Sequence, residues 1–326
     1  MRPEMPTPLL TPDDILQARA RIAGRVRTTP VLRLEPGAFG LRGEIVLKLE
    51  LLQHTGSFKP RGAFNKLLSS QVPEAGVIAA SGGNFGLAVG YAARELGHPA
   101  EVFVPETSPA IKARRIREMG ATVTIVPGFY DDAAAASREQ AASTGALVMH
   151  PFDQPEVVAG QGTIAAELTE QVHDADTVLV AIGGGGLIGG IAAWFEGRTR
   201  VVGIEPDTCP TMSEALRVGR PIPVEVGGYA ADSLGSRQAG DIAFEVASRY
   251  VEHVILVPDE TIIDAQRALW ERCRIVAEPG GAAAFAAVLS GRYLPDPDER
   301  VVVLVCGANT DAAWLVGDAE PISPAS

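Results

Sequence analysis

Short apolar runs rich in β-branched residues alternate with longer alanine-rich amphipathic segments along almost the whole chain. GVIAAS, AEVFVP, TVLVAIG, RVVGIE and RVVVLVCG are among the runs, and LAVGYAARELG and IKARRIREMG are two of the intervening segments. Strands that are apolar on both faces and are separated by helices are typical of parallel sheets with helices on either side. This alternation, more than any other feature, restricts the fold, and it predicts an α/β protein.

The strand–helix units fall into two groups, one from about residue 76 to 150 and one from about 175 onward. The segment between them, HPFDQPEVVAGQGT, is rich in proline, glycine and polar residues. A chain of 326 residues is long for one core. We therefore predict a small domain of residues 76–151 and a large domain of residues 1–75 and 152–326. Ligands of such folds bind at strand ends or between domains.

Composition excludes several classes of function. The chain has 28 basic and 40 acidic residues, a net charge of −12, which argues against nucleic acid as a partner. No window has the length and apolarity of a membrane helix, and the N-terminal segment does not resemble a signal peptide. Cys209, Cys273 and Cys306 fit neither a disulfide framework nor a zinc site. We expect a cytoplasmic protein without a membrane partner.

The segment HTGSFKPRGAFNK contains the first candidate for chemistry, Lys59. This lysine precedes a proline and lies among small residues with few charges nearby. An isolated lysine in such a segment is most often a surface residue on a turn. A desolvated lysine, however, loses its proton and becomes a nucleophile that can form a Schiff base. Both interpretations stay open for this loop by itself.

Two further loops join a strand to a helix through glycines. In the first, Ser81 to Asn84, free N–H groups at a helix N-terminus would suit a ligand carboxylate, although a plain turn capped by asparagine fits as well. In the second, Gly183 to Gly186, four glycines let the backbone approach an anion closely. A phosphate group is the natural guest of this second loop.

The second glycine loop also matches a dinucleotide-binding pattern. Gly184, Gly186 and Gly189 have the required spacing, and Glu205 ends the next strand where a ribose-binding acid would lie. An NAD-dependent oxidoreductase is therefore an alternative, although it leaves the other two loops without a role and lacks an obvious hydride-transfer partner. A cofactor-free binding or regulatory protein on the same scaffold is a third interpretation.

Taken together, the motifs resemble the serine/threonine dehydratase (threonine ammonia-lyase) and serine racemase group of fold-type-II pyridoxal-phosphate (PLP) enzymes. The three loops carry the resemblance together with HPFDQP and AGQGT, LWERCRIVAEPGGAA, and CGAN, from about Pro8 to Asp311. The resemblance implies two parallel-sheet αβα subdomains of the tryptophan-synthase-β-like fold with PLP in the cleft between them. It also implies a homodimer, and from the length of the chain we expect no C-terminal regulatory domain.

The implied reaction is α,β-elimination of water from a β-hydroxy-L-amino acid, giving a 2-oxo acid and ammonia. Threonine and serine are the default substrates, and a bulkier β-substituted analogue is an alternative. Serine racemase-type chemistry or another PLP-dependent β-elimination is the second alternative within the group.

The resemblance also assigns roles to residues. Lys59 would attach PLP and then act as the base on Cα, with Ser81 as the second catalytic residue. Asn84 would bind the 3′-hydroxyl of PLP, the glycine loop its phosphate, and Cys306 would face its ring nitrogen. The cofactor-binding residues would be Phe58, Lys59, Asn84, Gly183, Gly184, Gly185, Gly186, Leu187, Glu278 and Cys306. The substrate-binding residues would be Ser81, Gly82, Gly83, Asn84, Phe85 and Arg237.

Two departures from the group's pattern bear on the chemistry. Cys306 stands where relatives usually have serine, and a thiol with an ordinary pKa of about 8.5 does not hold a ring nitrogen protonated as a carboxylate would. This favours elimination over transamination, unless Cys306 is only a buried structural residue. Gly82 stands where racemases have a proton-donating serine. We therefore predict elimination without efficient racemisation.

Other departures concern the substrate and a cation. Phe85 replaces the histidine of many relatives, and with Arg237 it indicates a pocket not built for plain serine, although Arg237 fits a surface ion pair equally well. Glu205, Cys209 and Thr211 stand at the positions of a cation site in some relatives. The missing carboxylate at Thr211 lowers the expected affinity, which leaves a monovalent or weakly bound divalent cation as an option.

Overall fold

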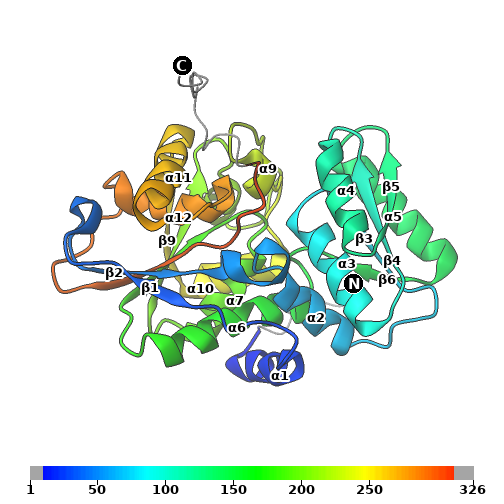
Figure 1. Cartoon of the computed structure of the whole chain (residues 1–326), viewed down its shortest axis with the longest axis horizontal. Helices are drawn as coiled ribbons and strands as arrows, with labels where there is room; N and C mark the ends of the chain where they lie inside the picture. The colour runs from blue at the N-terminus through cyan, green and yellow to red at the C-terminus, as the bar shows by residue number, and fades with distance from the viewer. Residues whose placement is uncertain (1–9, 312–326) are drawn as a thin grey trace, which may run out of the picture.

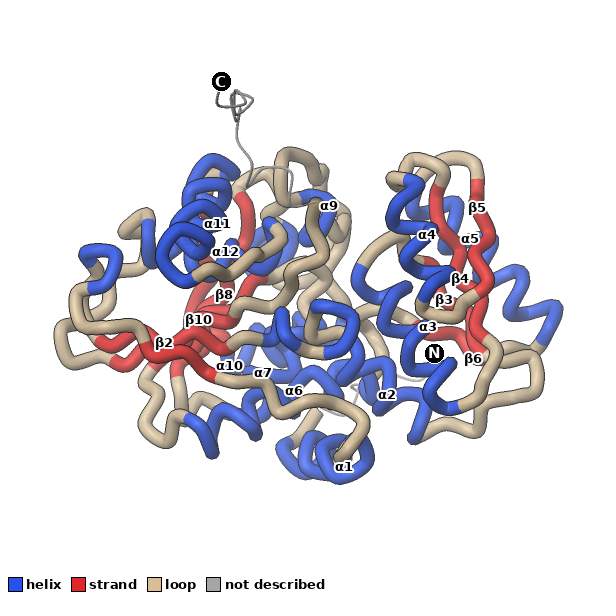
Figure 2. Tube along the Cα trace, viewed as in Figure 1, coloured by secondary structure: helices blue, strands red, loops and turns tan. Residues whose placement is uncertain are grey.

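The structure is a computed structural model that describes residues 10–311 and consists of two lobes (Figure 1). We call residues 76–151 the small lobe and the remaining described residues the large lobe. Each lobe contains one sheet flanked by helices on both faces (Figure 2). The four-stranded sheet uses strands only from residues 77–149, so the predicted small domain contains it.

The large lobe is built on a six-stranded sheet. Its order is β1 (Val31–Arg33), β2 (Glu44–Lys48), β10 (Arg300–Leu304), β7 (Thr177–Ala181), β8 (Arg200–Pro206) and β9 (Val251–Val257). All neighbours are parallel except β1 and β2, which are antiparallel. The short edge strand β1 was not among the predicted strands.

Alternate residues of these strands enter two separate cores, as expected for strands covered on both faces. Val178, Val180 and Val302 pack with α1 (Pro12–Ile22), α6 (Pro155–Gln171), α7 (Gly186–Phe195) and α10 (Asp241–Tyr250). Leu179, Val301 and Val303 pack with α11 (Asp259–Cys273) and α12 (Pro279–Leu289). The remaining helices of this lobe are η1 (Ala38–Gly40), η2 (Glu50–Leu52), η3 (His54–Gly56), α2 (Pro60–Leu68), α8 (Thr211–Val218) and α9 (Ala231–Leu234).

The small lobe has the same layered plan with four parallel strands. The order is β5 (Thr122–Val126), β4 (Ala100–Pro105), β3 (Val77–Ala80) and β6 (Leu147–Met149). One face packs on α3 (Asn84–Leu96) and α4 (Ala110–Glu118), and the other packs on α5 (Tyr130–Thr144). The α/β fold with parallel sheets in two units is thus confirmed.

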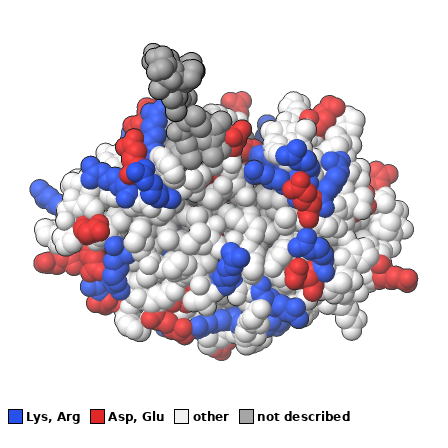
Figure 3. Space-filling model, viewed as in Figure 1, with Lys and Arg blue, Asp and Glu red and all other residues white. Residues whose placement is uncertain are grey.

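Charged side chains of both signs are mixed on the surface (Figure 3). On the face shown in Figure 3, acidic and basic side chains lie close to one another around a largely uncharged centre. Among the described residues, no helix has the length and apolarity needed to cross a membrane.

Candidate active site

Lys59 lies at the N-terminal end of α2, directly after a segment that is held by the loop following β10. Phe58 N–H donates to the carbonyl of Cys306 at 3.1 Å, and Ser57 forms an isolated antiparallel bridge with Gly307. The Lys59 amine donates to the Pro151 carbonyl oxygen at 2.9 Å. Part of the residue remains accessible, but burial of the amine lowers the pKa of Lys59 to about 8. A lysine in this setting is a far better nucleophile and base near neutral pH than a surface lysine.

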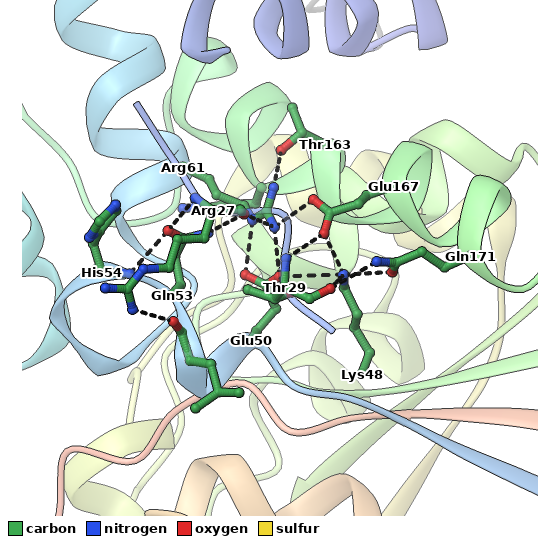
Figure 4. Close-up of polar contacts among 12 residues, drawn as sticks. Arg27, Thr29, Lys48, Glu50, Gln53, His54, Arg61, Thr163, Glu167 and Gln171 are labelled. Atoms are coloured by element: carbon green, nitrogen blue, oxygen red, sulfur yellow. Dashed lines mark hydrogen bonds and ion pairs between the residues drawn. The ribbon is translucent and has the colours of Figure 1, made fainter. Parts of the chain in front are cut away.

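A buried network of charges fixes the first turn of α2, only two residues beyond Lys59 (Figure 4). Arg61 binds both oxygens of Glu50, at 2.9 and 2.7 Å, and also donates to Glu167 at 2.8 Å. Burial alone would lower the pKa of Arg61, but the two carboxylates outweigh it and raise that pKa. The planar guanidinium can bind several acceptors at once, so it anchors α2 in a defined orientation.

Lys48 completes this network from strand β2. Its amine donates to Glu167 at 2.6 Å and to the Thr29 carbonyl at 2.7 Å. The network has two positive and two negative side chains, and all four are buried: Lys48, Arg61, Glu50 and Glu167. Balanced and hydrogen-bonded charges of this kind are tolerated in a protein interior. Figure 4 shows how β2, α2 and α6 meet at these side chains.

The second glycine loop joins β7 to α7 and packs against Phe152. A Cβ atom on Gly184 would overlap the Phe152 ring, and one on Gly186 would lie 2.9 Å from its backbone. Gly185 has a positive φ of 92°, which favours glycine. Phe152 adjoins Pro151, the acceptor of the Lys59 amine, so residues 151 and 152 connect the lysine to the glycine loop.

The N–H groups of this loop suit an anion. Within residues 10–311, no protein acceptor is recorded for the N–H groups of Gly184, Gly185, Gly186 and Leu187, and Gly185 offers no side chain to cap α7. Unpaired N–H groups at a helix N-terminus, together with the helix dipole, favour negative charge. The loop therefore fits the phosphate group that the sequence predicts.

Asn84 is the first residue of α3 in the small lobe, and its side chain contacts residues of the large lobe. Its Nδ2 donates to Glu278 at 2.6 Å, and its Oδ1 accepts from Asn309 Nδ2 at 2.7 Å. Burial raises the pKa of Glu278 to about 7, against the opposing effect of the Asn84 hydrogen bond. Glu278 was predicted near the cofactor without a defined role, and Asn309 was not singled out.

Cys306 is buried and neutral. Its thiol donates to the Gly280 carbonyl at 3.3 Å. Burial raises the pKa of this thiol well above the ordinary value. A thiol in this state does not act as the counter-charge of a protonated ring nitrogen. The position of Cys306 opposite the ring nitrogen stays a prediction.

The loop from Ser81 to Phe85 lies beside Lys59. The Phe85 ring is buried, and its centroid is 5.7 Å from the Lys59 amine. The centroid of the Phe58 ring is 5.0 Å from the same amine. Ser81 Oγ accepts from Gly83 N–H at 3.2 Å. A Cβ atom on Gly82 would overlap the hydroxyl of Ser108, a residue that sequence reasoning missed.

Arg237 is placed differently from the other predicted substrate-binding residues. Its guanidinium is 66% exposed and lies 3.5 Å from Asp131, which is itself 73% exposed. The surface ion pair foreseen as the alternative is therefore present, and it joins the two lobes, as does the pair between Lys112 and Asp232. A role for Arg237 in substrate binding remains a prediction, without support from this position.

The three residues considered for a cation already have other partners. Glu205 accepts from the backbone N–H groups of Met212 and Ser213 at 2.6 and 2.9 Å and thus caps α8. Cys209 donates to the Gly227 carbonyl, and Thr211 to the Ser236 carbonyl. In the part of the chain that the structure describes, no group of three or more His, Cys, Asp or Glu side chains could hold a metal ion.

Comparisons with known proteins agree with this arrangement. The sequence model of the family described as "Pyridoxal-phosphate dependent enzyme" matches residues 22–307. The chain is similar to the L-threonine ammonia-lyase of Thermotoga maritima, with 37% identity over 94% of this chain and 77% of the relative. Two similar solved structures are maize serine racemase (TM-score 0.88, 31% identity, 94% of this chain and 95% of that one) and a threonine deaminase from T.th. (0.87, 35%, 92% and 99%).

Proposed function

This chain belongs to the pyridoxal-phosphate dependent enzyme family, and we propose that it is a lyase that eliminates water from L-threonine or L-serine to give a 2-oxo acid and ammonia. One observation carries the proposal. A buried amine with a pKa lowered to about 8 donates to Pro151, and the next residue, Phe152, packs against a helix N-terminus whose N–H groups have no protein acceptor within residues 10–311. An amine for the cofactor aldehyde and a cradle for its phosphate are thus provided by adjoining segments.

The site residues fit the group in chemical terms. The N–H groups of Gly184 to Leu187 would hold the phosphate, Asn84 would donate to the ring hydroxyl, and Cys306 would face the ring nitrogen. Phe58 would pack beside the ring. When bound, PLP supplies an aldehyde that captures an amine and a ring that withdraws electrons from it. The NAD alternative explains the glycine loop alone and leaves Lys59 and Asn84 unused.

A residue of the protein would remove the Cα proton. Lys59 in its neutral form would accept the proton from the substrate Cα, because burial keeps its pKa near the working pH. Pro151 would hold the amine in place through its carbonyl oxygen. Ser81 and the neighbouring N–H groups would bind the substrate carboxylate at the N-terminus of α3. The enamine that leaves the site would then react with water to give the 2-oxo acid and ammonia.

Racemisation of serine is a second candidate, suggested by the similarity to a serine racemase. Gly82 carries no proton donor, and the nearest hydroxyl to its missing side chain is that of Ser108. Elimination is therefore the main reaction that we propose, with racemisation limited to what Ser108 could support.

The proposal extends to the setting of the enzyme. We propose a cytoplasmic homodimer that acts on free amino acids and does not bind nucleic acid or membranes, as the resemblance and the net charge of −12 suggest. Light scattering on the purified protein measures the oligomeric state directly.

A substrate panel tests the activity. The enzyme purified with PLP is incubated with L-threonine, L-serine and bulkier β-hydroxy amino acids, and 2-oxo acid and ammonia are measured. Equal amounts of both products from threonine or serine support the proposal. If only a bulkier substrate gave products, the proposed specificity for threonine or serine would be wrong. If none of the substrates gave a product, the proposed lyase activity would be contradicted.

A further inference from the structure

We propose that Asn309 and Glu278 are positioning residues that fix the orientation of the Asn84 amide and, through it, the hydrogen-bond donor offered to the cofactor ring. We call these three side chains the amide clamp. The inference rests on the proposed cofactor site, adds Asn309 to it and gives Glu278 a defined role.

The backbone carbonyl of Thr55, next to the amide clamp, determines the direction of the hydrogen bonds within it. The Thr55 carbonyl can only accept, and Asn309 Nδ2 donates to it at 2.7 Å. The second hydrogen of the same nitrogen goes to Asn84 Oδ1, also at 2.7 Å. The amide end of Asn84 that faces Asn309 must therefore be its oxygen. Its nitrogen then faces Glu278, whose carboxylate accepts at 2.6 Å.

Neither amide can flip without a conflict. A flipped Asn309 would place an oxygen against the Thr55 carbonyl, and a flipped Asn84 would place its NH₂ group against the Asn309 NH₂ group. The second N–H of Asn84 Nδ2 has no recorded acceptor among residues 10–311. A ligand beside Asn84 thus meets a donor and not an acceptor.

The backbone around the amide clamp is shaped to hold both of its ends. Thr55 has a left-handed φ of 61°, which is unfavourable for a β-branched residue, and Gly56 follows with a φ of 76°. A Cβ atom on Gly56 would lie 2.9 Å from Asn309 Oδ1. At the other end, a Cβ atom on Gly307 would overlap the Glu278 carboxylate. Side chains are absent at the two positions where they would displace the clamp.

The amide clamp also crosses the boundary between the lobes. Asn84 begins α3 in the small lobe, whereas Glu278 and Asn309 belong to the large lobe. Glu278 precedes α12, and its backbone N–H donates to the Gly307 carbonyl at 3.1 Å. The donor is therefore oriented only when the small lobe is seated on the large lobe.

A double-mutant cycle tests the amide clamp in the PLP-loaded enzyme. The variants are Asn84→Ala, Asn309→Ala, their combination, and Glu278→Gln. In Glu278→Gln the new NH₂ group would face a donor in either orientation, because Asn84 Nδ2 and the Asn309 backbone N–H both donate to Glu278. The readouts are the dissociation constant of PLP and the position of its visible absorbance band. Glu299→Gln is the control, because this buried carboxylate accepts from Thr177 and Tyr293 at the far end of β10.

Each single variant of the amide clamp should raise the PLP dissociation constant about tenfold and move the band, because one oriented hydrogen bond is lost. The combined variant should have the same PLP dissociation constant as Asn84→Ala alone, because Asn309 acts through Asn84. Glu299→Gln should leave both readouts unchanged. Asn309→Asp keeps the shape but opposes oxygen to oxygen at Thr55 and Asn84, so it should repeat the effect if Asn309→Ala folds poorly.

The outcomes separate the clamp from the proposed function. If wild-type protein shows the PLP band and the effects of Asn84→Ala and Asn309→Ala simply add, the clamp is overturned while the cofactor site stands. An unchanged band in Asn309→Asp would also overturn the clamp alone. A wild-type protein that takes up no PLP would overturn the cofactor site and the clamp together.

Discussion

The Lys59 amine and the Pro151 carbonyl oxygen are 2.9 Å apart, although 92 residues separate them in the chain. The contact joins the start of α2 in the large lobe to the segment that follows β6 in the small lobe. Phe152, the next residue, packs on the glycine loop. Two adjacent residues thus connect a nucleophile to an anion site.

The pH dependence of cofactor attachment should report the pKa of Lys59. Burial lowers this pKa from 10.5 to about 8, so the folded protein loses the proton earlier than the unfolded chain. The cost of burying the charged amine is fully present below pH 8 and is relieved as the pH rises from 8 towards 10.5. The rate of PLP attachment to protein freed of PLP should rise with pH and level off above about 8. A rate that keeps rising to about pH 10 would contradict this pKa.

Lys48→Met should destabilise the protein strongly without touching the glycine loop. It leaves Glu50 and Glu167 buried with only Arg61 to balance them. The loss should be about 3 kcal/mol in the free energy of unfolding, measured by denaturant titration. Adding Glu167→Leu removes the excess charge and should recover part of the loss. Arg217→Ala, which removes an exposed ion pair with Glu214, should have no measurable effect.

Gly184→Ala should weaken PLP binding by more than tenfold. The added methyl group would overlap the Phe152 ring, so the loop must move away from the position in which its N–H groups converge. Equilibrium dialysis of PLP measures the effect. Gly227→Ala is the matched control, because a Cβ atom there meets nothing within 4 Å. Equal PLP affinity in the two variants would show that the loop does not bind the phosphate.

Gly82→Ser should not turn the enzyme into an efficient racemase by itself. The new Cβ atom overlaps the Ser108 hydroxyl, so the loop or Ser108 must shift. Combining Gly82→Ser with Ser108→Gly provides the space, and this pair should form D-serine from L-serine faster than either single variant. Chiral chromatography measures the product. A single Gly82→Ser variant that racemises as fast as the pair would refute the steric explanation.

Local patterns carried much of the prediction. Strand–helix alternation indicated both sheets, because each strand and its neighbouring helix are encoded by a contiguous pattern of burial. The glycine loop was visible for the same reason, since a strand, four glycines and a helix follow one another. The edge strand β1 was missed because a run of three residues, two half-buried and one exposed, carries almost no periodicity.

Contacts between distant residues could not be predicted in this way. Asn84 meets Glu278 and Asn309 across 194 and 225 residues, and nothing in their local sequences indicates which amide end faces which acceptor. Glu205 is another such case. Its position left a cation ligand as an option, and the pattern gave no sign that its two oxygens accept from N–H groups at the start of α8. Motif position gives a residue's neighbourhood, and the hydrogen-bond partners decide what it does there.

The most direct test of the account is to locate the cofactor on the chain. The PLP-loaded protein is reduced with borohydride and digested, and the modified peptide is identified by mass spectrometry. We expect a single modification on Lys59, and Lys59→Ala protein should carry none. Modification at Lys48, Lys66 or Lys112, or no stable adduct in wild-type protein, would contradict the claim that Lys59 carries the cofactor.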